Sequence, residues 1–228
     1  MSLIVLYPLF FLLLSVLKDY PKGFALTKFW AYWLFLVPGV WISVKRIGKR
    51  NQLDRPCVYC SNHTSFLDIM YSYIIIPNYF VSMPKKELEK VPLFNLLIRK
   101  LNIPVDRKSK VDSYKSFTIA SNYLKQGVSI FLFPEGTISK SAPKLRPFKN
   151  GAFKLAIEHQ VPIVPITFKN NWELLQTGNI FSANGRPGIA RAVLHTPIET
   201  TGMTLDDVPE LSEKVRQVIE KGLDLERQ

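Results

Sequence analysis

An apolar run passes into a polar segment at Val58-Tyr59-Cys60-Ser61-Asn62-His63-Thr64-Ser65-Phe66-Leu67-Asp68. We interpret the run as the end of a short buried strand over residues 56–60, followed by a loop and a helix over residues 66–75. The loop places an imidazole, His63, five residues before a carboxylate, Asp68. A histidine that takes up a proton near neutral pH needs a partner that fixes its tautomer and stabilises the imidazolium. Asp68 can be that partner if the chain turns into a helix between the two residues.

This pair favours a general base that acts on a substrate hydroxyl, because the pair needs no metal and no side-chain nucleophile beside it. A structural alternative is a buried histidine at a strand end, with Asp68 capping the helix. A lipid hydrolase with Ser61 or Ser65 as nucleophile is a second alternative, but the chain has no Gly-x-Ser-x-Gly segment. A non-catalytic membrane adaptor is a third, and it leaves His63, Asp68 and Glu135 without a role.

A second segment, residues 130–137, is an apolar strand that runs into a Pro-Glu-Gly-Thr turn. Glycine-permitted turns at strand ends, lined by basic side chains, commonly hold anionic groups in α/β proteins. We therefore expect an anionic ligand group at this strand end. The basic residues that follow the turn are Lys140, Lys144, Arg146 and Lys149.

Short apolar runs alternate with helical periodicity from about residue 53 onward. This alternation predicts an α/β domain in which a mixed sheet is flanked by helices. Ligands collect at the carboxyl ends of strands in such sheets, which is where His63 and Glu135 fall. Asp112 is expected to cap a helix that ends at Gly127. The remaining predicted strands cover residues 79–83, 101–105, 129–133, 161–168 and 189–195, and the remaining predicted helices start near residues 85, 93, 151 and 211.

The first 50 residues contain two apolar runs, residues 3–17 and 29–44, with lysines and arginines between and after them. Each run is shorter than the roughly 20 residues of a perpendicular membrane span. We predict a helix pair over residues 1–50 that sinks into one membrane leaflet, and a catalytic domain over residues 51–228. Two tilted spans are the alternative. Trp30, Trp33 and Trp41 are expected at the membrane interface.

The net charge of +12 is unevenly placed. Residues 1–50 carry seven basic residues against one acidic residue, and residues 80–154 carry fifteen against five. This distribution suits a surface that faces an anionic phospholipid membrane, and substrates that carry phosphate. We expect no nucleic-acid partner, because no recognition helix, zinc finger or aromatic RNA-binding segment accompanies the charge.

The remaining candidates for chemistry are two cysteines and two histidines. Cys57 and Cys60 would point to opposite faces of an extended strand, which favours core thiols in a reducing compartment over a zinc or redox site. His159 is predicted at a helix end and His195 in a strand, and we expect structural roles for both.

Five ordered blocks make the chain resemble the glycerolipid acyltransferase family, in its bacterial form. They are Asn62-His63 with Asp68, Val105-Asp106-Arg107, Phe133-Pro134-Glu135-Gly136-Thr137, Phe148-Lys149-Asn150-Gly151, and Val161-Pro162-Ile163-Val164-Pro165.

The resemblance implies that an acyl chain passes from acyl-CoA or acyl carrier protein to the hydroxyl of lysophosphatidic acid, forming phosphatidic acid. It implies no metal and no cofactor beyond the thioester co-substrate. It also implies that the protein acts at the cytoplasmic face of the cell inner membrane. His63 and Asp68 would be the catalytic residues, with the oxyanion held by backbone amides of the turn at 135–137. The substrate-binding residues would be Arg107, Glu135, Gly136, Thr137, Arg146 and Lys149.

One position departs from the family pattern. The family carries arginine directly after Glu-Gly-Thr, where it is associated with the phosphate of the acceptor, and this chain has Ile138. Either Arg107, Arg146 or Lys149 holds the phosphate instead, or the acceptor is another lysophospholipid or an aminolipid.

Overall fold

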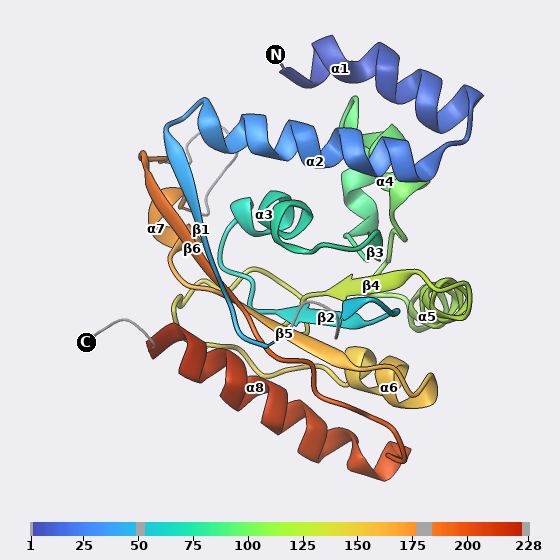
Figure 1. Ribbon diagram of the computed structural model, residues 1–228. Coiled ribbons are helices and arrows are strands. Elements are labelled where there is room, and N and C mark those ends of the chain that lie inside the picture. Colours follow the sequence, from blue (N-terminus) through green and yellow to red (C-terminus); the bar gives the residue numbers. More distant parts are fainter. Residues whose placement is uncertain (1, 49–52, 177–183, 225–228) are drawn as a thin grey trace.

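The computed structural model describes residues 2–48, 53–176 and 184–224, and its centre is a six-stranded sheet (Figure 1). The strand order is β1-β6-β5-β2-β4-β3. All neighbours are parallel except β5 and β6, so the predicted mixed sheet is confirmed. The strands are β1 Val40–Arg46, β2 Val58–Ser61, β3 Phe80–Ser82, β4 Ser129–Leu132, β5 Ile163–Phe168 and β6 Gly188–Leu194.

Helices cover both faces of the sheet. On one face lie α2 (Tyr20–Leu36) and α3 (Leu67–Ile75), and on the other lie α5 (Lys110–Lys125), α6 (Gly151–Glu158) and α8 (Val208–Asp224) (Figure 1). Shorter elements connect these layers or lie outside them. They are α1 (Ser2–Phe11) with its π-helical continuation η1 (Leu12–Val16), η3 (Lys86–Lys90), α4 (Phe94–Leu101), α7 (Asn171–Leu174) and η4 (Leu205–Asp207).

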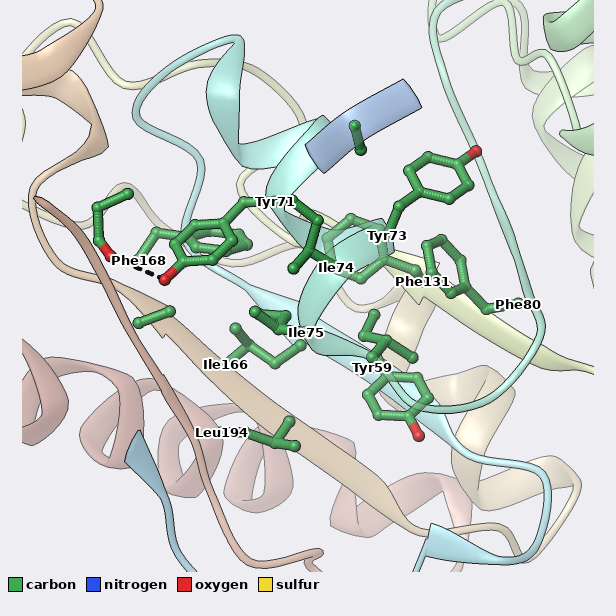
Figure 2. Close-up of a cluster of buried hydrophobic side chains, with 14 of the residues drawn as sticks. Tyr59, Tyr71, Tyr73, Ile74, Ile75, Phe80, Phe131, Ile166, Phe168 and Leu194 are labelled. Atoms are coloured by element: carbon green, nitrogen blue, oxygen red, sulfur yellow. Dashed lines mark hydrogen bonds between the residues drawn. The ribbon is translucent and has the colours of Figure 1, made fainter. Parts of the chain in front are cut away.

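The two faces have separate cores because side chains alternate along each strand. Cys57 and Tyr59 join the core under α2 and α3, whereas Val58 and Cys60 join the core under α5, α6 and α8. The two cysteines belong to different cores, which confirms that they point to opposite faces. Both thiols are buried and free, and burial raises the pKa of Cys57 to about 11. Figure 2 shows the first core, in which Tyr71 and other side chains of α3 lie over the strands.

The second apolar run does not continue as one helix. Helix α2 ends at Leu36, the chain turns at Gly39 with φ 73°, and residues 40–46 form strand β1. Strand β1 pairs in parallel with β6 from Val40 opposite Gly188 to Arg46 opposite Leu194. The pairing satisfies backbone groups that a helix would otherwise have to satisfy within itself. The prediction of a helix over residues 29–44 was therefore wrong beyond Leu36.

The N-terminal helix pair has a core of its own. Helix α1 and η1 pack on α2 and α4 through Leu3, Phe10, Leu14 and partners that include Trp30. The Nε1 of Trp30 donates to the Oγ of Ser2 over 3.1 Å, and its side chain is buried. Trp30 therefore does not lie at an interface, contrary to the prediction, whereas Trp33 and Trp41 are 50% and 65% exposed. Among the described helices, none is both long and apolar enough to cross a membrane.

Two smaller predictions were also wrong. Residues 101–105 form isolated bridges, Asn102 to Ser82 and Val105 to Lys85, instead of a strand. Ser109 caps α5 in place of Asp112, because the Ser109 side chain accepts from the Asp112 N–H over 3.1 Å.

Candidate active site

The loop between β2 and α3 is organised around one buried carboxylate. The Oδ2 of Asp68 lies 3.0 Å from the Nδ1 of His63 and accepts from the backbone N–H groups of Thr64 at 2.6 Å and Ser65 at 2.8 Å. Asp68 is fully buried in the first turn of α3. The carboxylate therefore satisfies loop amides ahead of the helix and contacts the imidazole, which confirms the pairing. The capping interpretation was wrong, because the N-cap residue of α3 is Phe66 and no side chain caps this helix.

The imidazole of His63 is held on two sides. Its Nδ1 faces Asp68, and its ring stacks on Phe133, with ring centroids 3.8 Å apart and planes 13° from parallel. Within the described residues, no hydrogen bond reaches the Nε2 of His63. A carboxylate at Nδ1 favours the tautomer with a proton on that nitrogen and a lone pair on Nε2. The geometry thus presents Nε2 as a base.

The end of β5 and the segment after it support this loop. These supporting contacts were not predicted from the sequence. The Nδ2 of Asn171 donates to the Oδ1 of Asp68 over 2.7 Å. Asn62 exchanges two hydrogen bonds of 2.8 Å with the backbone of Phe168, and the Oγ of Ser65 donates to the carbonyl of Leu175. The available signal was the pair Asn170-Asn171 directly after an apolar strand, because β5 proved to be the neighbour of β2.

Glu135 joins the His63 loop to a second loop. Its Oε1 accepts from the backbone N–H of His63 over 2.8 Å, and its Oε2 accepts from the backbone N–H of Arg146 over 3.0 Å. Burial raises the pKa of Glu135, and these two hydrogen bonds oppose the shift. Glu135 therefore links the His63 loop to the loop at Arg146, and its role in substrate binding stays a prediction.

Three other predicted residues meet at a small cavity of about 280 Å³. The guanidinium of Arg107 donates to the carbonyls of Gly136 and Met83, and the Lys149 side chain crosses over Gly136. Gly136 has φ 71°, a left-handed backbone conformation that favours glycine. Phe133 also lines the cavity, which therefore adjoins the His63 ring.

The turn after Gly136 runs beside the His63 loop. The N–H of Ser139 donates to the carbonyl of His63 over 2.8 Å, and the N–H of Gly136 donates to Phe133. The amides of Thr137 and Ile138 donate to no other residue that the structure describes. Arg146 contributes its backbone to the site, whereas its side chain is exposed and lies outside the residues that line the cavity.

The other histidines lie away from this site. The Nε2 of His195 lies 2.9 Å from the Oγ1 of Thr167, and burial lowers the pKa of His195 to about 4. The Nε2 of His159 lies 2.6 Å from the Oγ of Ser121. Their contacts fit the structural roles expected for them.

An α/β fold that carries a histidine–carboxylate pair at a strand end defines a class of enzymes that transfer or hydrolyse acyl groups. A family model described as Acyltransferase matches residues 43–169, which is more than half of the chain. The chain belongs to this acyltransferase family, and all five sequence blocks lie inside the matched range.

Curated relatives carry consistent names. The chain is 33% identical over 177 residues to a chloroplastic 1-acyl-sn-glycerol-3-phosphate acyltransferase, BAT2, of Brassica napus, covering 76% of this chain and 49% of that protein. It is 34% identical over 165 residues to human 1-acyl-sn-glycerol-3-phosphate acyltransferase alpha, covering 72% and 57%. The chain thus spans about half the length of these relatives. They come from a plant and an animal, so the bacterial form stays a prediction.

A solved structure has the same fold. The 1-acyl-sn-glycerophosphate (LPA) acyltransferase PlsC from Thermotoga maritima aligns with a TM-score of 0.77 at 23% identity. The alignment covers 96% of this chain and 86% of that one, so it includes the N-terminal helix pair as well as the sheet.

Proposed function

We propose that the protein transfers a fatty acyl chain from a thioester to the hydroxyl of lysophosphatidic acid, forming phosphatidic acid. The observation that carries the proposal is the His63 imidazole, held by a buried carboxylate at Nδ1 and unbonded to any described residue at Nε2. The names of the curated relatives support the choice of acceptor.

The mechanism follows from this geometry. The Nε2 of His63 takes the proton of the acceptor hydroxyl while the hydroxyl oxygen attacks the thioester carbonyl. Asp68 stabilises the resulting imidazolium. The tetrahedral intermediate collapses by breaking the carbon–sulfur bond. The thiolate leaves and takes the proton from His63, so that an ester and a free thiol are the products. This sequence needs no acyl-enzyme and no group beyond the thioester co-substrate.

The developing oxyanion requires hydrogen-bond donors. The amides of Thr137 and Ile138 suit this role because they follow a glycine turn beside the His63 loop and donate to no other described residue. The amide of Gly136 is less suitable because it already donates to the carbonyl of Phe133.

The acceptor phosphate fits the mouth of the small cavity. Arg107 and Lys149 both line it, and a guanidinium that contacts two carbonyls retains further N–H donors. Ile138 supplies no charge in the place where the family has arginine. If these two bases do not suffice, the acceptor is another lysophospholipid or an aminolipid.

The test is an acyl-transfer assay on purified protein across a panel of lysolipids, with acyl-CoA and acyl carrier protein as alternative donors. His63→Ala and Asp68→Asn should each reduce transfer at least 100-fold, as for a lost general base. Arg107→Ala should raise the KM for lysophosphatidic acid about 10- to 150-fold, the equivalent of a charged hydrogen bond. Near-normal turnover by His63→Ala would contradict the mechanism.

The panel also decides the acceptor. If a lysophospholipid with a capped phosphate outcompetes lysophosphatidic acid on the wild-type protein, the choice of acceptor is wrong although the reaction class stands. In that case Ile138→Arg should shift the preference toward lysophosphatidic acid, and Arg107→Ala should matter little.

We also propose that the protein works on an anionic phospholipid membrane, at the cytoplasmic face of the inner membrane. Helix α1, η1 and α2 expose several large apolar side chains, among them Val5 at 78%, Val16 at 59% and Trp33 at 50%. Many large apolar side chains exposed on neighbouring helices are typical of a membrane contact. Lys18 is exposed between η1 and α2, where anionic headgroups would attract it.

A further inference from the structure

The ring of Phe133 lies between the catalytic imidazole and the small cavity. It stacks on His63, with ring centroids 3.8 Å apart and planes 13° from parallel, and it also lines the cavity. His63 itself is not among the described residues that line the cavity. An aromatic ring therefore separates one face of the imidazole from the cavity. The acyl-transfer mechanism proposed above assigns no part to this ring.

The core and the following turn hold Phe133 in place. The residue directly follows β4, the parallel neighbour of the strand that leads to the catalytic loop. Its ring makes a T-shaped contact with the buried ring of Phe131, with centroids 4.8 Å apart and planes at 77°. Its carbonyl accepts from the N–H of Gly136 in the turn. The ring of Phe133 is therefore supported on the side away from His63 and can serve as a platform for the imidazole.

The proposed mechanism makes the imidazole positive. Its Nε2 takes the proton of the acceptor hydroxyl, and the ring keeps this charge until the thiolate leaves. The face of Phe133 lies 3.8 Å from that charge, well inside the roughly 6 Å over which an aromatic face attracts a cation. Because His63 is only 7% exposed, water screens this attraction little. The stack should therefore stabilise the imidazolium more than the neutral imidazole.

Charged groups of both signs surround the catalytic imidazole. Asp68 contacts its Nδ1, and Glu135 accepts from the backbone N–H of the same residue. Two cations, Arg107 and Lys149, line the cavity that Phe133 also lines. Nearby like charges disfavour an imidazolium, so these cations would oppose protonation of an imidazole that shared the cavity with them. The apolar ring of Phe133 keeps the imidazole out of that cavity.

We propose that Phe133 is a positioning residue for the general base: its ring fixes the plane of the His63 imidazole and stabilises the imidazolium that forms during transfer. A parallel ring opposes rotation of the imidazole about its Cβ–Cγ bond, which keeps Nδ1 on Asp68. An aliphatic side chain would fill similar space without a π face, so the role depends on aromaticity and not on volume alone. This inference rests on the proposed acyl transfer and adds a residue to it.

Fluorination of the Phe133 ring tests the attraction to charge, because fluorine weakens the negative π face with little change of shape. Full-length protein with one, two and then three ring fluorines at Phe133 should lose kcat stepwise, by about 2- to 30-fold over the series, with little change in either KM. The same series at Phe153 is the matched control, because that ring is fully buried in the core under α5, α6 and α8 and stacks on Phe148. Equal kcat across the series at Phe133 would overturn the stabilisation of the imidazolium.

Natural side chains separate aromaticity from volume. Phe133→Leu should lower kcat about 10-fold, whereas Phe133→Tyr, which keeps the π face, should stay within about 3-fold of wild type. Circular dichroism and chemical unfolding check that both variants fold. Wild-type kcat in folded Phe133→Leu would show that the ring only fills space, and would overturn the proposal.

Nuclear magnetic resonance of isotope-labelled histidine tests the positioning without using activity. The chain has three histidines, and His63→Ala identifies the signals of His63 by their loss. The Nδ1 of His63 lies 3.0 Å from Asp68, so its proton should give a sharp resonance in wild type and in Phe133→Tyr, and a broadened or absent one in Phe133→Leu. An unchanged resonance in Phe133→Leu would overturn the positioning role. A wild-type protein that transfers no acyl chain would instead contradict the proposed function, which this measurement does not depend on.

Discussion

The amide of Asn171 donates to the Oδ1 of Asp68 over 2.7 Å, between residues 103 positions apart in the chain. Asp68 therefore accepts from Asn171 on one oxygen, and its other oxygen serves two backbone amides and His63. A buried carboxylate is stable only when its lone pairs are satisfied in this way. We infer that Asn171 fixes the orientation of the acid that holds the catalytic imidazole.

Replacing this amide should impair catalysis with little effect on substrate binding. Asn171→Leu leaves an oxygen of a buried carboxylate without its donor, which costs about 1–3 kcal/mol or more for a charged group. We expect kcat to fall about 10-fold or more, with both KM values unchanged and the circular dichroism spectrum retained. An unchanged kcat in Asn171→Leu would contradict the inference that Asn171 positions Asp68.

Asn171→Asp gives a pH-dependent version of the same test. When the introduced carboxyl group is protonated, it can still donate to Asp68, but two ionised carboxylates this close repel each other. The activity of this variant relative to wild type should therefore decrease as pH rises. Asn122→Asp, on an exposed position of α5, should follow the wild-type profile at every pH.

Glu135 should behave as a support for two loops. Glu135→Gln replaces one carboxylate oxygen with an amino group, which cannot accept from a backbone N–H. One of the two hydrogen bonds from the backbone to this side chain is therefore lost. The loss should reduce kcat and also lower the free energy of unfolding by about 1–3 kcal/mol. Steady-state kinetics and chemical unfolding measure the two effects. If Glu135 contacts substrate instead, the acceptor KM rises and the unfolding free energy stays at the wild-type value.

His63 and Asp68 could be found from the sequence because they are only five residues apart, a separation over which local pattern is informative. Sequence reasoning could not find the contact of Asn171 with Asp68, or that of Glu135 with the His63 backbone, because these contacts depend on β5 and β4 flanking β2 in the sheet. Strand order follows from packing of the whole chain, and a run of apolar residues does not encode it. Residues 40–46 show the same limit, because a short apolar run suits a buried helix or a strand equally well.

Gly222 should be required for helix α8 to reach the sheet. A Cβ atom at Gly222 would lie 2.3 Å from the Oγ1 of Thr167 and 2.9 Å from the Nε2 of His195. Alanine is the better helix former by about 1 kcal/mol, but overpacking a core contact costs about 1–3 kcal/mol. We expect Gly222→Ala to destabilise the protein in urea unfolding, whereas Lys221→Ala, at the exposed neighbouring position, should stay within about 0.5 kcal/mol of wild type.

His195 should make the fold sensitive to moderate acid. Burial lowers its pKa from 6.5 to about 4, so between these values the unfolded chain binds a proton that the folded chain does not. Stability is therefore complete above pH 6.5 and is lost as pH falls toward 4, by about 3 kcal/mol in total. In guanidinium unfolding from pH 7 to pH 4, His195→Gln should lose less stability than wild type. Parallel curves for the two proteins would show that His195 does not contribute.

The exposed apolar face of the N-terminal helices should determine membrane binding. Truncation is a poor test, because Phe24, Ala31 and Phe35 of α2 belong to the core that covers the sheet. Point substitutions on the outer face avoid this problem. Val5→Glu and Trp33→Glu each replace an apolar side chain whose burial in lipid would contribute about 1.5–3 kcal/mol.

We expect each substitution to reduce binding to vesicles of phosphatidylethanolamine and phosphatidylglycerol about 10-fold or more in a sedimentation assay. Leu205→Glu is the matched control, because Leu205 is 51% exposed but lies in η4, which leads into α8 on the opposite face of the sheet (Figure 1). High salt should weaken the binding of wild type only in part, since apolar contact persists when headgroup charges are screened. Equal loss by Leu205→Glu, or complete release by salt, would contradict insertion of this face.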